Sequence, residues 1–191
     1  MAGAKPSFSE VHVIRTIIAL QARTGRKKLL RKIGIGEGSM RTILKKLKNN
    51  DLIDSAKKGH ALNDSGNGYL NEYMKKFSAP FKIHADDIVG GRKTGIVVHA
   101  ASGKITTGLL ERDMAVRTGA SGAIVLKYDN KAKKLTFPDE VRQVEDFPGF
   151  KNEIESLNIY FNSGDVLVVA FSDDYIVSEN AALEIALRLV D

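Results

Sequence analysis

The first third of the chain has the hydrophobic pattern of three short helices. Apolar side chains recur every three or four positions in residues 8–23 and again in residues 26–32, which predicts two helices. Glycines at positions 34 and 36 then allow a tight turn, and a third helix is predicted to follow it. The buried stripe of this third helix is formed by Met40, Ile43, Leu44 and Leu47. Three helices with a glycine turn before the third are the order of a helix-turn-helix.

The face of the third helix opposite this stripe is basic and sterically open. On a helical wheel it carries Gly38, Thr42, Lys45 and Asn49, with Arg41 and Lys46 on its flanks. Arginine and lysine bind phosphates, and arginine and asparagine can also bind base edges in the major groove. The pattern therefore predicts a DNA-recognition helix, and the alternative is an ordinary solvated surface helix.

A short hairpin and a fourth helix are predicted after the recognition helix. Residues 52–55 and 61–63 read as two strands, joined by the tip Lys57-Lys58-Gly59-His60. Such a hairpin would be a wing that places cations along the phosphates, unless it is a plain surface hairpin. Residues 64–77 read as a helix with an aromatic face, which we assign either to the core or to a dimer contact.

Residues 8–77 resemble the winged helix-turn-helix transcriptional regulators of bacteria and archaea, similar to the MarR and DtxR groups. The resemblance rests on residues 34–47, on Asn50-Asp51-Leu52-Ile53 in place of the usual Glu-Gly-Leu-Ile, and on residues 62–66 in place of Leu-Thr-x-x-Gly. The whole chain resembles small archaeal regulators that join such a domain to an uncharacterised C-terminal α/β domain.

The resemblance implies a set of DNA-contacting positions. Residues of the recognition helix that fall at such positions are Gly38, Ser39, Arg41, Thr42 and Lys45. The helical wheel adds Lys46, and the hairpin tip adds Lys57, Lys58 and His60. Glu37 and Gly38 depart from the polar pair that the family often carries, although Gly38 would allow close backbone approach.

The second half of the chain alternates strands and helices after a boundary at Ser78-Ala79-Pro80. The predicted elements are strands 94–101, 123–128, 135–137 and 166–171 and helices 107–118, 152–161 and 178–190. This order, βαββαβ with a terminal helix, matches a ferredoxin-like sheet. We therefore predict an α+β chain with a winged helix-turn-helix in residues 1–80 and an α/β ligand-sensing or dimerisation domain in residues 81–191.

Charge is distributed unevenly between these halves. Residues 1–82 contain 17 Lys and Arg against 6 Asp and Glu, a net charge of +11, whereas residues 83–191 contain 12 against 17, a net charge of −5. The basic half suits a polyanionic partner, and the acidic half does not.

Composition excludes several classes of protein. The chain has no cysteine, which rules out disulfides and thiol catalysis and fits a reducing cytoplasm. No apolar run approaches the roughly 20 residues that span a bilayer, and the N-terminus lacks the pattern of a secretory signal, so we expect a soluble protein that does not contact membranes. With only four scattered histidines, we expect no metal and no cofactor.

Several fragments of the second half allow a catalytic interpretation, and each is weak. The glycine-rich stretch 90–95 precedes a strand, whereas phosphate loops follow one, and Ser102-Gly103-Lys104 lacks the remaining Walker residues. Asp173-Asp174 lies between a strand and a helix and could bind a ligand or cap the helix. His84 and His99 would bind a metal only if the fold brought carboxylates to them.

The pattern as a whole predicts a cytoplasmic transcriptional regulator that binds double-stranded DNA as a homodimer. A small-molecule effector bound in the second half would control it. The alternative is a small-molecule enzyme whose winged helix serves as a docking domain.

Overall fold

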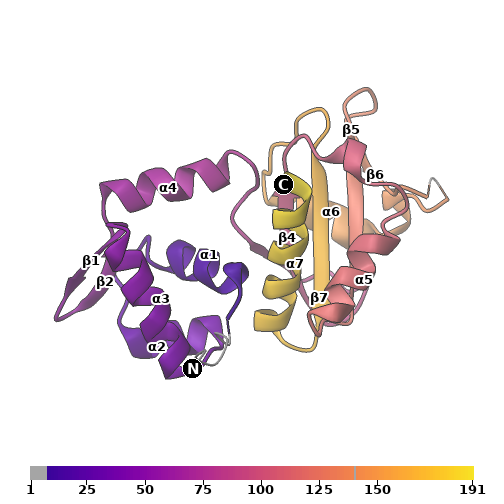
Figure 1. Ribbon diagram of the computed structural model, residues 1–191. Coiled ribbons are helices and arrows are strands. Elements are labelled where there is room, and N and C mark those ends of the chain that lie inside the picture. Colours follow the sequence, from indigo (N-terminus) through magenta and orange to yellow (C-terminus); the bar gives the residue numbers. More distant parts are fainter. Residues whose placement is uncertain (1–7, 140) are drawn as a thin grey trace. The chain divides into compact units, whose positions relative to one another are not determined.

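The computed structural model describes residues 8–139 and 141–191. The chain divides into two compact units, residues 1–74 and 75–191, each with its own hydrophobic core. Figure 1 shows helices and a small hairpin in the first unit and a sheet flanked by helices in the second. The protein is therefore of the α+β class, as predicted. Among the described residues, no helix combines the length and the hydrophobicity needed to cross a membrane.

The first unit has the element order of a winged helix-turn-helix. Its elements are α1 (Glu10–Ala19), α2 (Arg26–Ile33), α3 (Glu37–Asn49), β1 (Ile53–Ala56), β2 (Gly59–Leu62) and α4 (Asp64–Met74). Met40, Ile43, Leu44 and Leu47 of α3 are buried, as their spacing predicts. They join the core formed by residues from α1, α2, β1 and α4.

The turn between α2 and α3 is held by a buried arginine of α1. Gly34 ends α2 in the left-handed region at φ 79°, which a side chain would disfavour, and Gly36 begins α3 in an extended conformation. The guanidinium of Arg15, only 2% exposed, donates to the carbonyl oxygens of Ile33 (3.0 Å) and Lys32 (2.9 Å). Carbonyls at a helix C-terminus lack partners within the helix, so Arg15 caps α2 and fixes where α3 begins.

The hairpin is attached to the helices at both of its ends. His60 of β2 exchanges backbone hydrogen bonds with Thr24 (2.8 and 3.0 Å), so the segment before α2 is joined to the hairpin by an isolated β-bridge. At the other end, the Asn63 side chain accepts from the backbone N–H of Gly66 (2.9 Å) and donates to the carbonyl of Asp51 (2.9 Å). A Cβ on Gly66 would lie 2.0 Å from the Leu52 carbonyl oxygen, so this close approach requires glycine.

The second unit is built on a five-stranded sheet whose neighbours are all antiparallel. The strands are β3 (Phe81–Ile83), β4 (Arg92–Val98), β5 (Gly122–Asp129), β6 (Lys134–Thr136) and β7 (Val166–Ser172), in the spatial order β3-β4-β7-β5-β6. The helices are α5 (Leu109–Arg117), α6 (Pro148–Ser156) and α7 (Tyr175–Val190), with short 3-10 turns η1 (Ser102–Lys104) and η2 (Val144–Asp146).

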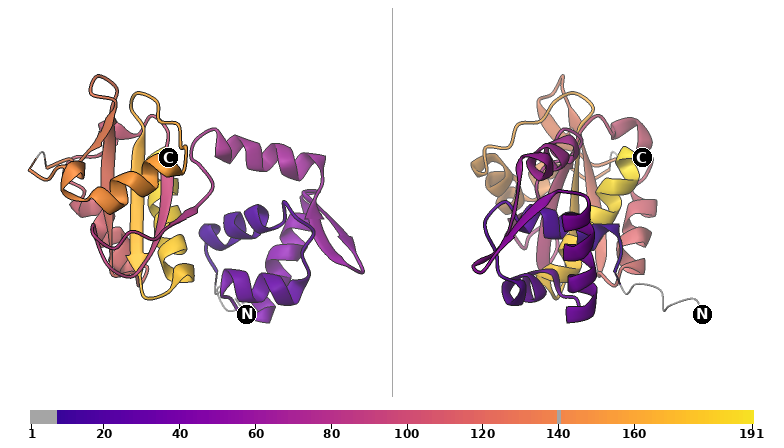
Figure 2. Two further views of the ribbon diagram at one scale, coloured as in Figure 1. Left: turned by 180° about the vertical axis from the view of Figure 1, so that it is seen from behind. Right: turned by 60° about the vertical axis from the view of Figure 1, so that its left-hand side comes forward.

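Helices cover both faces of this sheet. In Figure 1, α5 and α7 lie side by side on one face, and Figure 2 (left) shows α6 on the opposite face. Leu167 and Val169 of β7 pack with Phe150 and Ile154 of α6, and the alternate residues of β7 point to the other layer. Burial on both sides explains why the strands read as continuous apolar runs although their pairing is antiparallel.

The expected ferredoxin-like strand order is wrong. The four strands of the predicted βαββαβ order are β4, β5, β6 and β7. In a ferredoxin-like sheet the first and third of these, β4 and β6, would be central, whereas here the last one, β7, lies between β4 and β5. Strand β6 has only one buried residue, Leu135, and lies at the edge of the sheet. β7 has apolar residues on both faces and is almost wholly buried, so hydrophobicity favours β7 in the centre.

The segment that leads into the second unit also differs from the prediction. Helix α4 ends at Met74 rather than at residue 77, and Phe77 is fully buried beside β4, where it pairs with Val98. The short edge strand β3 was not predicted, because its alternation covers only three residues.

Replacement of Arg15 should destabilise the first unit. Arg15→Met keeps the apolar stem but leaves the carbonyls of Lys32 and Ile33 without their donors, and we expect a loss of about 2–3 kcal/mol in the free energy of unfolding. Urea denaturation followed by circular dichroism measures this loss. Arg31→Met, at an exposed position of α2, is the matched control and should change stability by less than about 0.5 kcal/mol. Equal effects of the two substitutions would contradict the capping role.

Candidate nucleic-acid interface

A basic groove lies between helix α3 and the hairpin of the first unit. It has a volume of about 590 Å³ and its wall is formed by α3, both strands and the start of α2. Six cationic side chains line it and no carboxylate does: Arg26, Arg41, Lys45, Lys48, Lys57 and Lys58. Close positive charges repel one another unless an anion neutralises them, so the groove is suited to a polyanion. We call it the basic groove.

Glu37 is the acidic neighbour of this groove. It is the first residue of α3, and its carboxylate lies 3.4 Å from the guanidinium nitrogens of both Arg26 and Arg41. All three side chains are about half exposed or more, so solvent screens these pairs and they add little stability. The pairs show that an arginine of α2 and an arginine of α3 lie at the same end of the groove, next to Glu37.

The predicted residues of the first turns of α3 have distinct environments. Gly38 is exposed, and a Cβ at this position would meet no atom within 4 Å, so the helix backbone is open to a ligand. Ser39 is half-buried. Thr42 is exposed, and its hydroxyl donates to the carbonyl oxygen of Gly38 (3.0 Å), which leaves the hydroxyl oxygen as an acceptor.

The structure places six of the nine predicted residues on two surfaces, and Gly38, Ser39 and Thr42 line neither of them. Arg41, Lys45, Lys57, Lys58 and His60 line the basic groove, whereas Lys46 lines a separate hollow between α1, α3 and α4. Three polar side chains line the groove that were not in the predicted set: Arg26, Lys48 and Ser55. Lys48 is on the same flank of the helical wheel as Arg41 and could have been found there, but Arg26 and Ser55 reach the groove only through the tertiary fold.

The hairpin has a side-chain hydrogen bond between its strands and two lysines at its turn. Lys57 and Lys58 form the two-residue turn between Ala56 and Gly59. The His60 ring accepts or donates at Nδ1 with the Ser55 hydroxyl (2.8 Å) on the facing strand. Burial lowers the pKa of His60 below its usual 6.5, and the charges of Arg26, Lys48 and Arg23 lower it further. His60 is therefore uncharged at neutral pH in the free protein.

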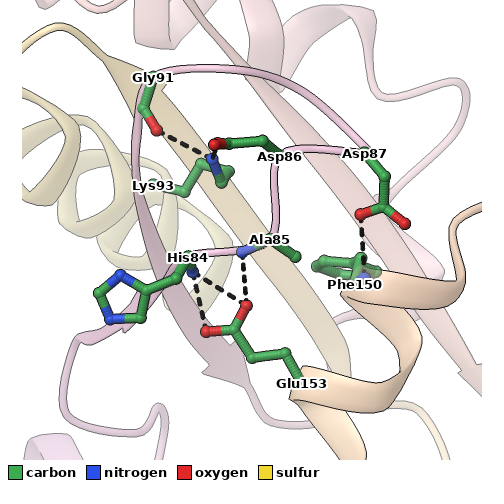
Figure 3. A network of polar contacts seen from close by, with 8 residues as sticks. All are labelled: His84, Ala85, Asp86, Asp87, Gly91, Lys93, Phe150 and Glu153. Atoms are coloured by element: carbon green, nitrogen blue, oxygen red, sulfur yellow. Dashed lines mark hydrogen bonds and ion pairs between the residues drawn. The ribbon is translucent and has the colours of Figure 1, made fainter.

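The glycine-rich stretch of the second unit is used internally. Figure 3 shows the loop between β3 and β4: the Lys93 ammonium, fully buried, donates to the Asp86 carboxylate and to the Gly91 carbonyl (2.8 Å). The hydrogen bond and charge of Lys93 lower the pKa of Asp86. The lysine of this stretch is therefore committed to partners within the loop, and its arginine, Arg92, lies over the ring of Tyr175.

The same loop is fastened to helix α6 by two carboxylates. Glu153 of α6 accepts from the backbone N–H groups of His84 (2.8 Å) and Ala85 (2.6 Å), and Asp87 accepts from that of Phe150 (3.0 Å) at the start of α6 (Figure 3). Asp87 also accepts from the backbone N–H of Gly149 (2.7 Å). Asp87 thus acts as a helix cap, and neither carboxylate is arranged as a metal ligand with His84.

The remaining chemical candidates also have structural roles. Asp174 accepts from the backbone N–H of Ile176 and caps α7. His99 does meet a carboxylate, since its Nδ1 lies 3.1 Å from Asp165, but Asp165 also accepts from two backbone N–H groups. In residues 8–139 and 141–191, no group of three or more His, Cys, Asp or Glu could hold a metal ion.

The fold and the basic groove define a chain with a winged helix-turn-helix unit followed by an α/β unit. The chain belongs to the family described as Domain of unknown function (DUF4443), whose model matches residues 89–189, more than half of its length. Residues 11–68 match the model described as PH0730-like, N-terminal domain. A solved structure, the hypothetical protein PH0730 from Pyrococcus horikoshii OT3, is 26% identical, with a TM-score of 0.82 over 96% of this chain and 93% of that chain. No curated protein matches the chain.

The geometry of the hairpin depends on Gly59. This residue has φ +118°, and a Cβ would lie 2.5 Å from the carbonyl oxygen of Thr24. We expect Gly59→Ala to weaken the pairing of β2 with Thr24 and to lower the free energy of unfolding by at least about 1–2 kcal/mol. Faster hydrogen exchange of the Thr24 and His60 amides would report it. Gly38→Ala is the same substitution at an open helical site and should leave these amides unchanged; equal protection in both variants would contradict the prediction.

Proposed function

We propose that this protein is a transcriptional regulator that binds double-stranded DNA through the basic groove. The observation that carries the proposal is the convergence of six cationic side chains from α2, α3 and the hairpin on one groove with no carboxylate in its wall. Helix α3 would enter the major groove, where Arg41 and Lys45 face the duplex, and the turn Lys57–Lys58 would follow the phosphates.

A homodimer is the assembly that we propose. Two copies related by a two-fold axis would place two α3 helices in successive major grooves, on half-sites about 10 base pairs apart or a multiple of that spacing. The second unit would either pair the copies or respond to a small-molecule effector. A ligand that changes the spacing of the helices would alter DNA affinity by a coupling of about 1–3 kcal/mol.

We propose further that the second unit senses rather than catalyses. The enzymatic alternative drew on the loop before β4 and on Asp173-Asp174. Lys93 of that loop is bound to Asp86 and Gly91, and Asp174 caps α7, so stabilisation of the fold accounts for both features. A regulator needs neither a nucleophile nor a base at these places.

Loss of two groove cations should weaken DNA binding strongly. For the full chain carrying Arg41→Ala and Lys45→Ala, we expect affinity for a labelled mixed-sequence duplex to fall at least about tenfold. The slope of log affinity against log salt should also fall by about two, because two fewer counterions are released. Fluorescence anisotropy across a salt series measures both quantities.

The matched control removes the same two charges from the second unit. Lys104→Ala with Arg117→Ala changes two exposed residues outside the basic groove and should leave affinity and salt slope as they are. The proposal would be contradicted if DNA binding did not respond to salt, or if the groove variant bound DNA as tightly as the unmodified protein.

DNA affinity should depend on pH through His60. Duplex phosphates beside Arg26 and Lys48 would neutralise charges that lower the His60 pKa, so this pKa is higher in the complex than in the free protein. Affinity should therefore rise as the pH falls through the range between the two pKa values, and stay constant above the higher one. Anisotropy at fixed ionic strength tests this. His60→Gln should flatten the profile and His84→Gln, in the second unit, should preserve it; the opposite pattern would refute the assignment.

A further inference from the structure

A pocket in the second unit is unexplained by the proposed DNA contacts. It has a volume of about 300 Å³ and lies between helix α6, the β5–β6 hairpin and residues 159–161. Its floor is apolar and belongs to the core of the unit: Leu135, Val144, Phe150 and Ile154 are all buried. This volume is at the lower end of small-molecule sites, large enough for a one- or two-ring molecule.

The walls of the pocket are aromatic. Tyr128 of β5 and Phe161 stack on one another, with ring centroids 5.5 Å apart and planes inclined by 20°. Tyr160 also lines the pocket and is 90% exposed, so its apolar ring is left in contact with solvent. A flat ring inserted between these side chains and the floor would bury the exposed aromatic surface.

The rim of the pocket is mainly cationic. Three ammonium groups, from Lys133, Lys134 and Lys151, face two carboxylates, and Lys134 lies 3.6 Å from one of these, Glu145. A backbone hydrogen bond and the charges of Lys134 and Lys151 lower the pKa of Glu145, so the two lysines create a field that stabilises a carboxylate at this rim. An anionic group on a bound molecule would meet the same field.

We infer that this pocket binds a small aromatic carboxylate, which deepens the proposed function by giving the effector a site and a chemical class. The ring would occupy the apolar floor against Tyr128 and Phe161, and the carboxylate would lie at the rim near Lys151. The role of this molecule as an effector rests on the proposed DNA-binding function, whereas the existence of the binding site does not depend on that function.

The pocket has a physical connection to the start of the second unit. Phe150, Lys151 and Ile154 line it from α6, the helix whose Glu153 binds the backbone of His84 and Ala85. Those residues directly follow β3, the first strand after the segment that joins the two units. A ligand that shifts α6 would therefore move the attachment point of the chain that leads to the DNA-binding unit.

The chain contains no tryptophan, which makes indole compounds selective probes. Indole-3-acetate, indole-3-acetamide and tryptamine share one ring and differ in charge, and each is titrated into the full-length protein with excitation that selects indole over tyrosine. We expect a saturable change with indole-3-acetate and at least about tenfold weaker binding of tryptamine. No saturable signal, or equal affinity for the acid and the amine, would overturn the inference.

Two variants locate the binding. Lys151→Glu reverses one rim charge and should weaken binding of indole-3-acetate about tenfold or more, whereas Lys131→Glu makes the same change at an exposed residue of the neighbouring turn, outside the pocket, and should have little effect. Amide NMR shifts on adding the acid should concentrate at residues 133–135, 150–155 and 159–161. Shifts in the first unit instead would overturn the assignment.

The link to DNA is measured separately. Saturating indole-3-acetate should change the affinity for a mixed-sequence duplex by about 5- to 150-fold, and Glu153→Gln should reduce that change without abolishing binding of the acid. If the acid binds and DNA affinity stays constant, the site stands and its regulatory role fails. If the protein binds no DNA under any condition, the proposed function fails while the pocket titration keeps its meaning.

Discussion

The first unit depends on one buried cation. Removing a guanidinium from water costs free energy, and Arg15 recovers it by donating to carbonyls that the end of α2 leaves without helical partners. Because the same contact sets the point where α2 stops, it also sets where the glycine turn begins and in which direction α3 leaves it. The outward face of α3, and with it one wall of the basic groove, is thus a consequence of a polar contact inside the core.

The sequence predicts the first unit well because its signals are local. The stripe of Met40, Ile43, Leu44 and Leu47 and the turn glycines Gly34 and Gly36 act within a few residues of one another, and they are buried or placed at the turn as predicted. Arg15 could not be found in this way, since its partners lie 17 and 18 positions away and its charge suggests an exposed residue. Arg26 and Ser55 reach the groove for the same long-range reason.

Strand order in the second unit shows the limit of this reasoning. Element types and their approximate bounds follow from apolar runs, but the runs do not state which strand pairs with which. Burial decides: β7 is apolar on both faces and takes the central place, and β6, with polar residues on each side of Leu135, remains at the edge. Asp174, which the sequence offers either as a ligand or as a cap, caps helix α7, and that distinction required the position of the backbone N–H group of Ile176.

If α3 binds DNA as we propose, the hydroxyl of Thr42 restricts which bases it can recognise. Its proton is donated to the Gly38 carbonyl, so the oxygen presented outward can only accept a hydrogen bond. In the major groove, the base edges that donate are the amino groups of adenine and cytosine. A helix placed there would therefore favour adenine or cytosine over guanine or thymine on the strand facing Thr42, a preference encoded by a hydrogen bond within the helix itself.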